Sequence, residues 1–295
     1  MDSLYNTFKV QEGSQLSLKD IDLSYTASLQ KEGSKQLLSE YKRKLIELQD
    51  KFYAARKRSL LIIFQAMDAA GKDSAIKHVM SGVNPQGCQV FSFKQPGPED
   101  ELHDFLWRHN KALPEKGRIG IHNRSHYENV LVCRVHPELV LKDDLPGVES
   151  LASLDKEFWQ ERFKSINHFE KHLADNGTVI LKFFLHISRD KQRERFLKRI
   201  DDKSKNWKFS GADLNERAFW DHYMQAYQEA IRYTSTKEAP WFVIPANHKW
   251  FTRVAVISVI VEALQDLSLH YPHVSEDDAR KLNQYRNTLI NEKNS

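Results

Sequence analysis

Short, uninterrupted apolar runs alternate with longer amphipathic segments along most of the chain. The five apolar runs cover residues 60–64, 90–93, 119–121, 179–187 and 241–244. They lack the alternation of apolar and polar positions that is typical of a strand with one face in water. Continuous runs of this kind are typical of strands that are buried on both faces. The sequence therefore predicts five buried strands.

Helical periodicity fills the segments around these runs. Apolar residues recur at helical spacing within residues 33–58, 72–80, 99–112, 154–174, 191–200, 215–233 and 250–269. Strands that alternate with helices form parallel β-α-β units. We therefore predict an α/β fold, a three-layer α/β/α sandwich with a five-stranded parallel sheet. Residues 1–32 are polar and weakly patterned, which predicts an N-terminal arm ahead of a single domain over residues 33–295.

Composition excludes several classes of protein. With 40% hydrophobic residues among 295, the chain can bury a large core, so global disorder is excluded. The 44 Lys and Arg exceed the 40 Asp and Glu by four, and so weak a net charge does not identify a polyanionic partner. Cys88 and Cys133 stand far apart without a C-x-x-C motif, which excludes a disulfide scaffold and a cysteine zinc site. We expect a cytoplasmic protein with neither export signal nor membrane anchor.

The first apolar run leads into a candidate phosphate-binding loop. Small residues there would let backbone N–H groups surround a phosphate, while a helix N-terminus and Lys72 add positive charge. Ala66 replaces the usual first glycine, and Asp73 replaces the usual Ser or Thr. The candidate phosphate-binding residues are Ala69, Ala70, Gly71, Lys72, Asp73 and Ser74. An ordinary strand-to-helix turn remains the alternative.

Two carboxylates in this loop indicate a metal ion. Asp68 and Asp73 would repel a bound phosphate unless a cation lay between them. Asp68 is therefore the candidate metal ligand. Asp73 also suits the first turn of a helix for electrostatic reasons alone, so its metal role stays open.

The third apolar run ends in a second group of polar residues. Ligands of open α/β sheets bind at the carboxyl ends of the strands, where Asn123 and Arg124 are expected. Arg124 could bind phosphate, Asn123 takes the usual place of an acidic metal ligand, and Glu128 could supply the missing negative charge. A surface ion pair between Arg124 and Glu128 is the alternative.

The fourth run is followed by another arginine and a basic segment. Arg189 stands at the same predicted sheet edge, and Lys203, Lys205 and Lys208 follow within a stretch rich in Lys and Arg. This segment is interpreted either as a phosphate-gripping lid or as a solvated helix face. Lys94 and Arg108 are weaker candidates for the same groove.

At these residues the chain resembles the type-2 polyphosphate kinases, which move phosphate between inorganic polyphosphate and nucleotides. The resemblance runs from about residue 33 to residue 269. Its most specific segments are residues 64–73 (FQAMDAAGKD), 84–87 (NPQG), 106–109 (LWRH), 120–132 (GIHNRSHYENVLV), 135–138 (VHPE), 206–209 (NWKF), 239–246 (APWFVIPA) and 249–253 (KWFTR). It is closest to class III, whose members accept AMP and ADP and carry an Asn at the position of Asn123.

The resemblance implies a fold, a cofactor and residue roles. It implies a thymidylate-kinase-like P-loop fold with a helical lid near residues 201–215, and dependence on Mg²⁺, with Mn²⁺ as an alternative. Asp68 would hold the metal and act with the catalytic group Lys72, Asn123, Arg124, Glu128 and Arg189. The implied partners are polyphosphate, AMP, ADP and ATP, without nucleic acid or membrane. A homodimer or homotetramer is also implied.

We therefore expect in-line attack by a terminal phosphate oxygen of AMP or ADP on the end phosphorus of polyphosphate. Such a nucleophile is already ionised, so no general base is required. One alternative is a nucleoside monophosphate kinase that uses ATP, which shares the loop and the strand-end arginine. Another is a non-catalytic binder of polyanions such as RNA.

Overall fold

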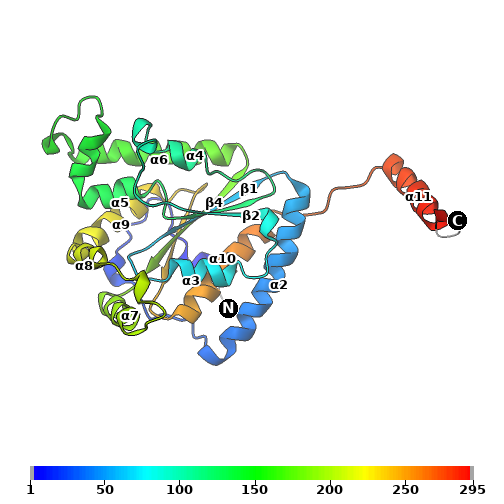
Figure 1. Cartoon of the computed structure of the whole chain (residues 1–295), viewed down its shortest axis with the longest axis horizontal. Coiled ribbons are helices and arrows are strands. Elements are labelled where there is room, and N and C mark those ends of the chain that lie inside the picture. The colour runs from blue at the N-terminus through cyan, green and yellow to red at the C-terminus, as the bar shows by residue number, and fades with distance from the viewer. Residues whose placement is uncertain (1–2, 293–295) are drawn as a thin grey trace.

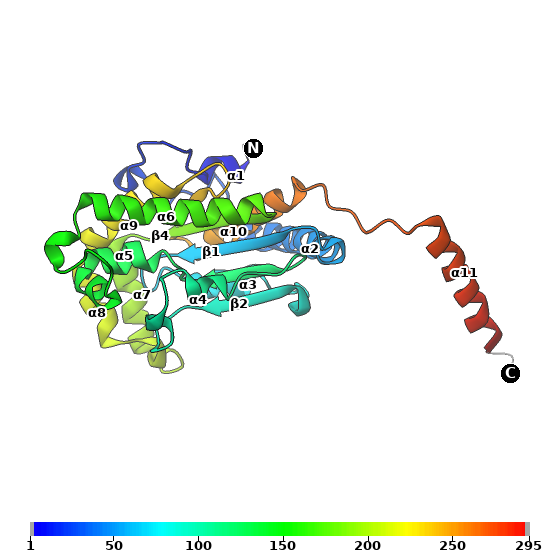
Figure 2. The same ribbon diagram turned by 90° about the horizontal axis from the view of Figure 1, so that it is seen from above.

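The computed structural model describes residues 3–292, apart from the Lys208 side chain. Its core is a five-stranded sheet of β1 (Ser59–Gln65), β2 (Cys88–Ser92), β3 (Ile119–Asn123), β4 (Thr178–His186) and β5 (Trp241–Pro245). All neighbouring strands are parallel, in the order β2-β3-β1-β4-β5 (Figures 1 and 2). The five-stranded parallel sheet predicted from the apolar runs is confirmed.

Helices cover both faces of this sheet. One layer contains α2 (Lys31–Ala55), α3 (Lys72–Val79) and α10 (Lys249–Gln265), in which α10 contacts both of the other helices. The other contains α5 (Glu128–Val135), α6 (Lys156–Asp175) and α9 (Trp220–Thr234). The remaining α7 (Arg189–Asp201) and α8 (Gly211–Ala218) lie beyond the carboxyl ends of the strands. The three-layer sandwich is confirmed.

Burial explains the unbroken apolar runs. All seven residues of β1 and the last seven of β4 are buried, because helices pack on both faces of the central strands. Helix α10 is buried almost all round, since it lies between the sheet and α2. Its apolar sequence reflects this position, and none of the helices in the described residues is long and apolar enough to cross a membrane.

The predicted helix over residues 99–112 is wrong. The segment holds a single 3-10 turn, Asp100–Leu102, and the four-residue helix α4 (Trp107–Asn110). The Asp100 carboxylate accepts a hydrogen bond from Gly97 N, and the Asp104 carboxylate accepts one from Leu106 N. Such side-chain bonds to the backbone compete with helical hydrogen bonds. The predicted helix over residues 215–233 is likewise divided, between α8 and α9 at Phe219.

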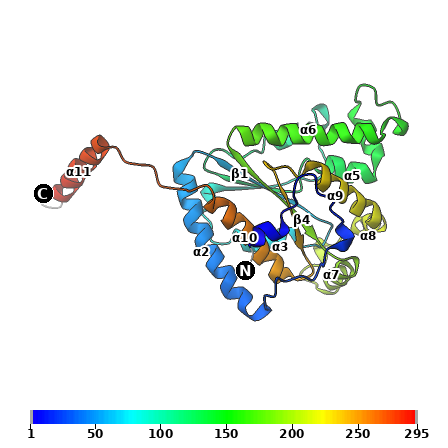
Figure 3. The ribbon, with the colours of Figure 1, turned by 180° about the vertical axis from the view of Figure 1, so that it is seen from behind.

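The two ends of the chain behave differently. The N-terminal segment, with α1 (Leu4–Phe8), crosses α10 and reaches the edge strand β5 (Figure 3). There Val10 N donates to Trp241 O over 2.8 Å. Phe8, Val10 and Leu18 are buried, so this segment covers a strand edge with apolar contacts. The C-terminal α11 (Glu276–Asn291) projects from the body with every residue exposed, and it lies beyond the last helix predicted from the sequence, residues 250–269.

Candidate active site

Three strand-to-helix connections meet at one edge of the sheet. Phe64 of β1 pairs with Asn123 of β3 on one side and with Phe183 of β4 on the other. The segments that follow these strands therefore leave the sheet side by side, as they do in other open α/β sheets. They carry the predicted site residues of the loop after β1, the turn after β3 and the start of α7.

The loop after β1 has the backbone shape of an anion-binding nest. Ala69 has φ +59° and Gly71, the N-cap of α3, has φ +111°. Glycine is needed at position 71 because a side chain is strained at that φ. The loop thus passes directly into a helix N-terminus, where backbone N–H groups bind anions.

Lys72 folds back over this loop. Its Nζ donates to Ala66 O over 2.7 Å. Burial lowers its pKa, while the nearby Asp68 carboxylate opposes that shift. The ammonium group therefore lies at the phosphate loop, where its hydrogen bond to the Ala66 carbonyl can be exchanged for one to a phosphate oxygen.

Arg124 and Asp68 form an ion pair across the site. Arg124 Nη2 lies 3.3 Å from Asp68 Oδ1, and both side chains are partly exposed. Arg124 has φ +66°, which turns the chain sharply at the end of β3. The predicted alternative, a surface ion pair with Glu128, does not form: within residues 3–292 the ion pair of Arg124 is with Asp68, while the charge of Glu128 acts on Arg124 without a direct ion pair.

Glu128 and Asn123 complete this side of the site. Burial raises the pKa of Glu128, although the positive charges of Arg124 and Lys72 act against the shift. Asn123 Nδ2 donates to Asp73 Oδ1 over 2.8 Å. An aspartate at position 123 would instead face Asp73 with a like charge. The structure therefore brings Asp68, Lys72, Asp73, Asn123, Arg124 and Glu128 into one cluster.

The remaining predicted residues lie at the margin of this cluster. Arg189 is the exposed first residue of α7. Lys203 and Lys205 are exposed in the turn after α7, where Lys205 pairs with Asp202. The Lys208 side chain lies outside the described part of the structure. On the other side, Arg108 Nη1 donates to Lys94 O over 2.9 Å.

A basic cluster between α7 and α10 was missed by sequence reasoning. It consists of Arg195, Lys198, Arg199, Lys249 and Arg253. Burial, together with the four arginine and lysine neighbours, lowers the pKa of Lys249 to about 8. Arg253 Nη2 donates to Ser74 Oγ over 2.9 Å, which places the cluster beside the phosphate loop. The spacing of Lys249 and Arg253, four residues apart on one helix, was the available signal.

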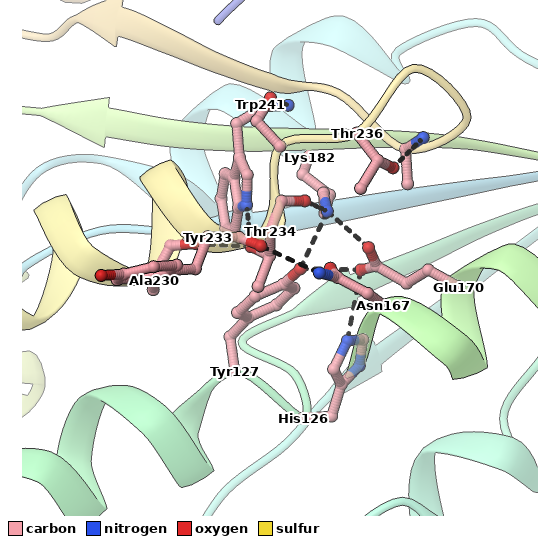
Figure 4. A network of polar contacts seen from close by, with 12 residues as sticks. His126, Tyr127, Asn167, Glu170, Lys182, Ala230, Tyr233, Thr234, Thr236 and Trp241 are labelled. Atoms are coloured by element: carbon pink, nitrogen blue, oxygen red, sulfur yellow. Dashed lines mark hydrogen bonds and ion pairs between the residues drawn. The ribbon is translucent and has the colours of Figure 1, made fainter. Parts of the chain in front are cut away.

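A buried polar network stands behind the site (Figure 4). Lys182 of β4 is fully buried and donates to Glu170 Oε2 at 2.5 Å, to Tyr127 Oη at 2.8 Å and to Thr234 O at 2.7 Å. Tyr127 Oη also donates to Glu170 Oε1 over 2.9 Å. Because Tyr127 directly precedes Glu128, this network anchors the turn that carries Arg124 and Glu128.

Buried histidines make the stability sensitive to acid. Burial lowers the pKa of His122 and of His186 to about 4, whereas an unfolded chain protonates histidine near pH 6.5. Below pH 6.5 the unfolded state therefore binds protons that the folded state excludes. We expect the free energy of unfolding, measured with urea, to fall by about 2 kcal/mol for each histidine between pH 7 and pH 5. In His186→Gln this fall should be smaller; an unchanged fall would contradict the assignment.

The fold and the site define a phosphate-loop kinase: a parallel sheet with β1 at its centre, an anion nest at the N-terminus of α3, and a lysine and an arginine facing it. The family model described as polyphosphate kinase 2 matches residues 28–271. The chain belongs to this family, so the kinase class and the family predicted from its motifs are confirmed. Helix α11 lies beyond the matched residues.

Two relatives and one crystal structure are similar to nearly the whole chain. An ADP-polyphosphate phosphotransferase from Rhodopseudomonas palustris is 47% identical, over 96% of this chain and 97% of the relative. An AMP/ADP-polyphosphate phosphotransferase from Meiothermus ruber is 43% identical, over 90% of this chain and 94% of the relative. The crystal structure of polyphosphate kinase 2 from Arthrobacter aurescens TC1 has 40% identity and a TM-score of 0.87, over 97% of each chain.

Proposed function

We propose that this protein transfers the terminal phosphate of inorganic polyphosphate to AMP and ADP, giving ADP and ATP, in a reversible reaction. The observation that carries the proposal is the convergence of Lys72 and Arg124 on the anion nest of Gly71. The relative named as an ADP-polyphosphate phosphotransferase and the one named as an AMP/ADP-polyphosphate phosphotransferase are similarly close in sequence. The acceptor range is therefore part of the proposal.

The chemistry asks for alignment and positive charge. In phosphoryl transfer most of the rate comes from holding donor and acceptor in line and from stabilising charge on the transferring group. Backbone N–H groups at the start of α3, with Lys72 and Arg124, supply that charge. Arg189 would reach the donor chain from the start of α7. The attacking phosphate oxygen is ionised near neutral pH, so no general base is needed.

The acidic residues fit a divalent cation such as Mg²⁺, or Mn²⁺ in its place. Mg²⁺ usually takes one or two protein carboxylates together with substrate phosphates and water. Asp68 is partly exposed beside the nest and would hold the ion, with Asp73 and Glu128 close to Lys72. Among the described residues, no group of three or more His, Cys, Asp or Glu side chains could hold a metal ion by itself. Binding through one or two carboxylates and the substrate phosphates does not need such a group. When bound, the cation neutralises charge on the phosphates.

Polyphosphate would follow the basic cluster between α7 and α10. Arg253 contacts Ser74 at the phosphate loop, and Arg199, which pairs with Asp213, lies in the same cluster. The lowered pKa of Lys249 reflects its burial and these positive neighbours. Lys203, Lys205 and Lys208 in the proposed lid would extend this track. Lys94 and Arg108, the weaker candidates for phosphate binding in the same groove, lie on the opposite side of the site.

The lowered pKa gives a pH test of this track. Lys249 carries its charge below pH 8 and loses it as the pH rises through 8. We expect the KM for polyphosphate to rise about tenfold between pH 7.5 and pH 9.5, since one charged contact is lost. Lys249→Arg stays charged throughout and should abolish the rise. If this variant and the wild-type protein share one pH profile, polyphosphate does not contact Lys249.

The reaction itself is tested with purified protein, Mg²⁺ and long-chain polyphosphate, given AMP or ADP in separate tubes. Chromatography should show ADP and ATP formed from AMP without added ATP. If nucleotides are unchanged in both tubes while ATP phosphorylates a nucleoside monophosphate, the protein is an ordinary nucleotide kinase. If anions bind without turnover, it is a polyanion-binding protein.

We also propose a cytoplasmic homodimer or homotetramer that binds neither nucleic acid nor membrane. Cys88 and Cys133 are both free thiols, which suits a reducing compartment. The assembly state is measured by light scattering of the purified protein.

A further inference from the structure

Side chains of helix α7 donate hydrogen bonds to backbone carbonyls of the phosphate loop. Gln192 Nε2 donates to Asp68 O over 2.9 Å. Arg195 Nη1 donates to the next two carbonyls, Ala69 O at 3.0 Å and Ala70 O at 2.6 Å. Three consecutive carbonyls of the loop are therefore bound by two side chains that stand three positions apart on one helix.

Arg195 also ties the loop to the segment after β5. Its Nη2 donates to Ala246 O at 2.6 Å and to Asn247 O at 3.1 Å. The side chain is only 9% exposed, and among the described residues it has no carboxylate partner. A guanidinium group that is buried with only carbonyl oxygens as partners costs free energy, because its charge leaves water without a carboxylate to balance it. Such an arrangement points to a role that packing alone would not require.

That role follows from peptide geometry. The C=O and N–H of a trans peptide point in opposite directions. Drawing the carbonyls of Ala69 and Ala70 toward α7 therefore turns the N–H groups of the following residues away from it. Ala69 is also held at φ +59°, a strained value for a residue with a side chain, which persists only when neighbouring contacts enforce it.

A third side chain connects this arrangement to α8. Arg217 Nη1 donates to Gln192 Oε1 over 2.7 Å and to Arg189 O over 2.8 Å. Gln192 is 1% exposed and uses both ends of its amide, one toward α8 and one toward the phosphate loop. A continuous chain of hydrogen bonds thus runs from α8, which begins within the proposed lid, to Asp68.

We propose that Arg195 and Gln192 are positioning residues that hold the phosphate loop in its anion-binding shape, and that Arg217 couples this shape to the position of the lid. The inference rests on the proposed function, because it assigns these residues to the same phosphate site. Closure of the lid over polyphosphate and ordering of the phosphate loop then occur together, since Gln192 of α7 is hydrogen-bonded both to Asp68 in the loop and to Arg217 of α8.

The first test is Arg195→Lys, which keeps the charge but cannot make the forked set of hydrogen bonds. We expect kcat/KM for polyphosphate to fall about 100-fold, since more than one charge-assisted bond is lost. Hydrogen exchange of backbone amides in residues 66–74, measured without ligand, should accelerate about tenfold. Exchange within β1 should not change. Arg193→Lys on the exposed side of α7 is the matched control and should leave both quantities unchanged.

The second test is a double-variant cycle of Gln192→Leu and Arg217→Leu. Each should lower kcat/KM about tenfold and accelerate exchange of the same amides, whereas the double variant should be no worse than Gln192→Leu alone. Fully independent effects, or unchanged exchange with lowered turnover, would overturn the coupling. Exchange is measured without the reaction, so its result stands apart from the proposed function. A wild-type protein that fails to use polyphosphate would overturn that function instead.

Discussion

Lys72→Ala should reduce kcat/KM for polyphosphate-driven ATP synthesis about 1,000-fold, since removing one group that stabilises transition-state charge commonly costs this much. The Lys72 ammonium is half-buried at the phosphate loop, where it lies 2.7 Å from Ala66 O and is surrounded by Asp68, Asp73 and Glu128. Water and salt cannot replace a charge held at that position. The measurement is initial rate with ADP and long-chain polyphosphate.

Lys77→Ala is the matched control, because Lys77 is exposed on the same helix α3. It should retain wild-type rates. The free energy of unfolding should be similar in the two variants, since neither removes buried apolar contact. A loss of less than tenfold in Lys72→Ala would place the transferring phosphate elsewhere.

Lys182→Met should destabilise the protein by about 3–5 kcal/mol, the usual cost of leaving one member of a buried ion pair without its partner. Met has a similar volume, so the main change is electrostatic. Glu170 is 1% exposed and loses the ammonium at 2.5 Å. Its pKa, which Lys182 now holds down against the effect of burial, should rise in the variant. The measurement is urea unfolding at pH 8.

The pH dependence separates this cause from simple loss of packing. In the variant Glu170 takes up a proton as the pH falls, so the stability difference from the wild-type protein should shrink between pH 8 and pH 5. The double variant Lys182→Met, Glu170→Leu removes both charges and should recover much of the loss. A difference that is constant with pH, and no recovery in the double variant, would show that packing dominates.

Local sequence predicted the elements whose causes are local. The apolar runs became strands because residues such as Leu61 and Ile62 are buried on both faces wherever parallel strands pair. The phosphate loop was recognisable because its backbone needs Gly71 and its chemistry needs Lys72, and both stand next to each other in the chain. The end of the third apolar run then indicated Arg124, which lies opposite that loop.

Helical spacing was misleading over segment 99–112, because the side chains of Asp100 and Asp104 bond to nearby backbone N–H groups and hold the segment in turns.

Other features depend on how the elements of the fold pack together. Lys182 of β4 bonds to Glu170 of α6 and to Tyr127, which stands 55 positions away in the sequence. A lysine inside an apolar run gives no indication of which carboxylate will meet it.

The sequence by itself thus determined the sheet, the phosphate loop and the family, because each is encoded in contiguous patterns, and it predicted the candidate site residues from the ends of those patterns. The tertiary structure decided what surrounds them. It placed Arg195 of α7 against carbonyls of the phosphate loop, and it brought Lys249 and Arg253 beside Ser74. These contacts form only when the strands align in register, since hydrogen bonds and charges act over a few ångströms while the residues are separated by more than a hundred positions.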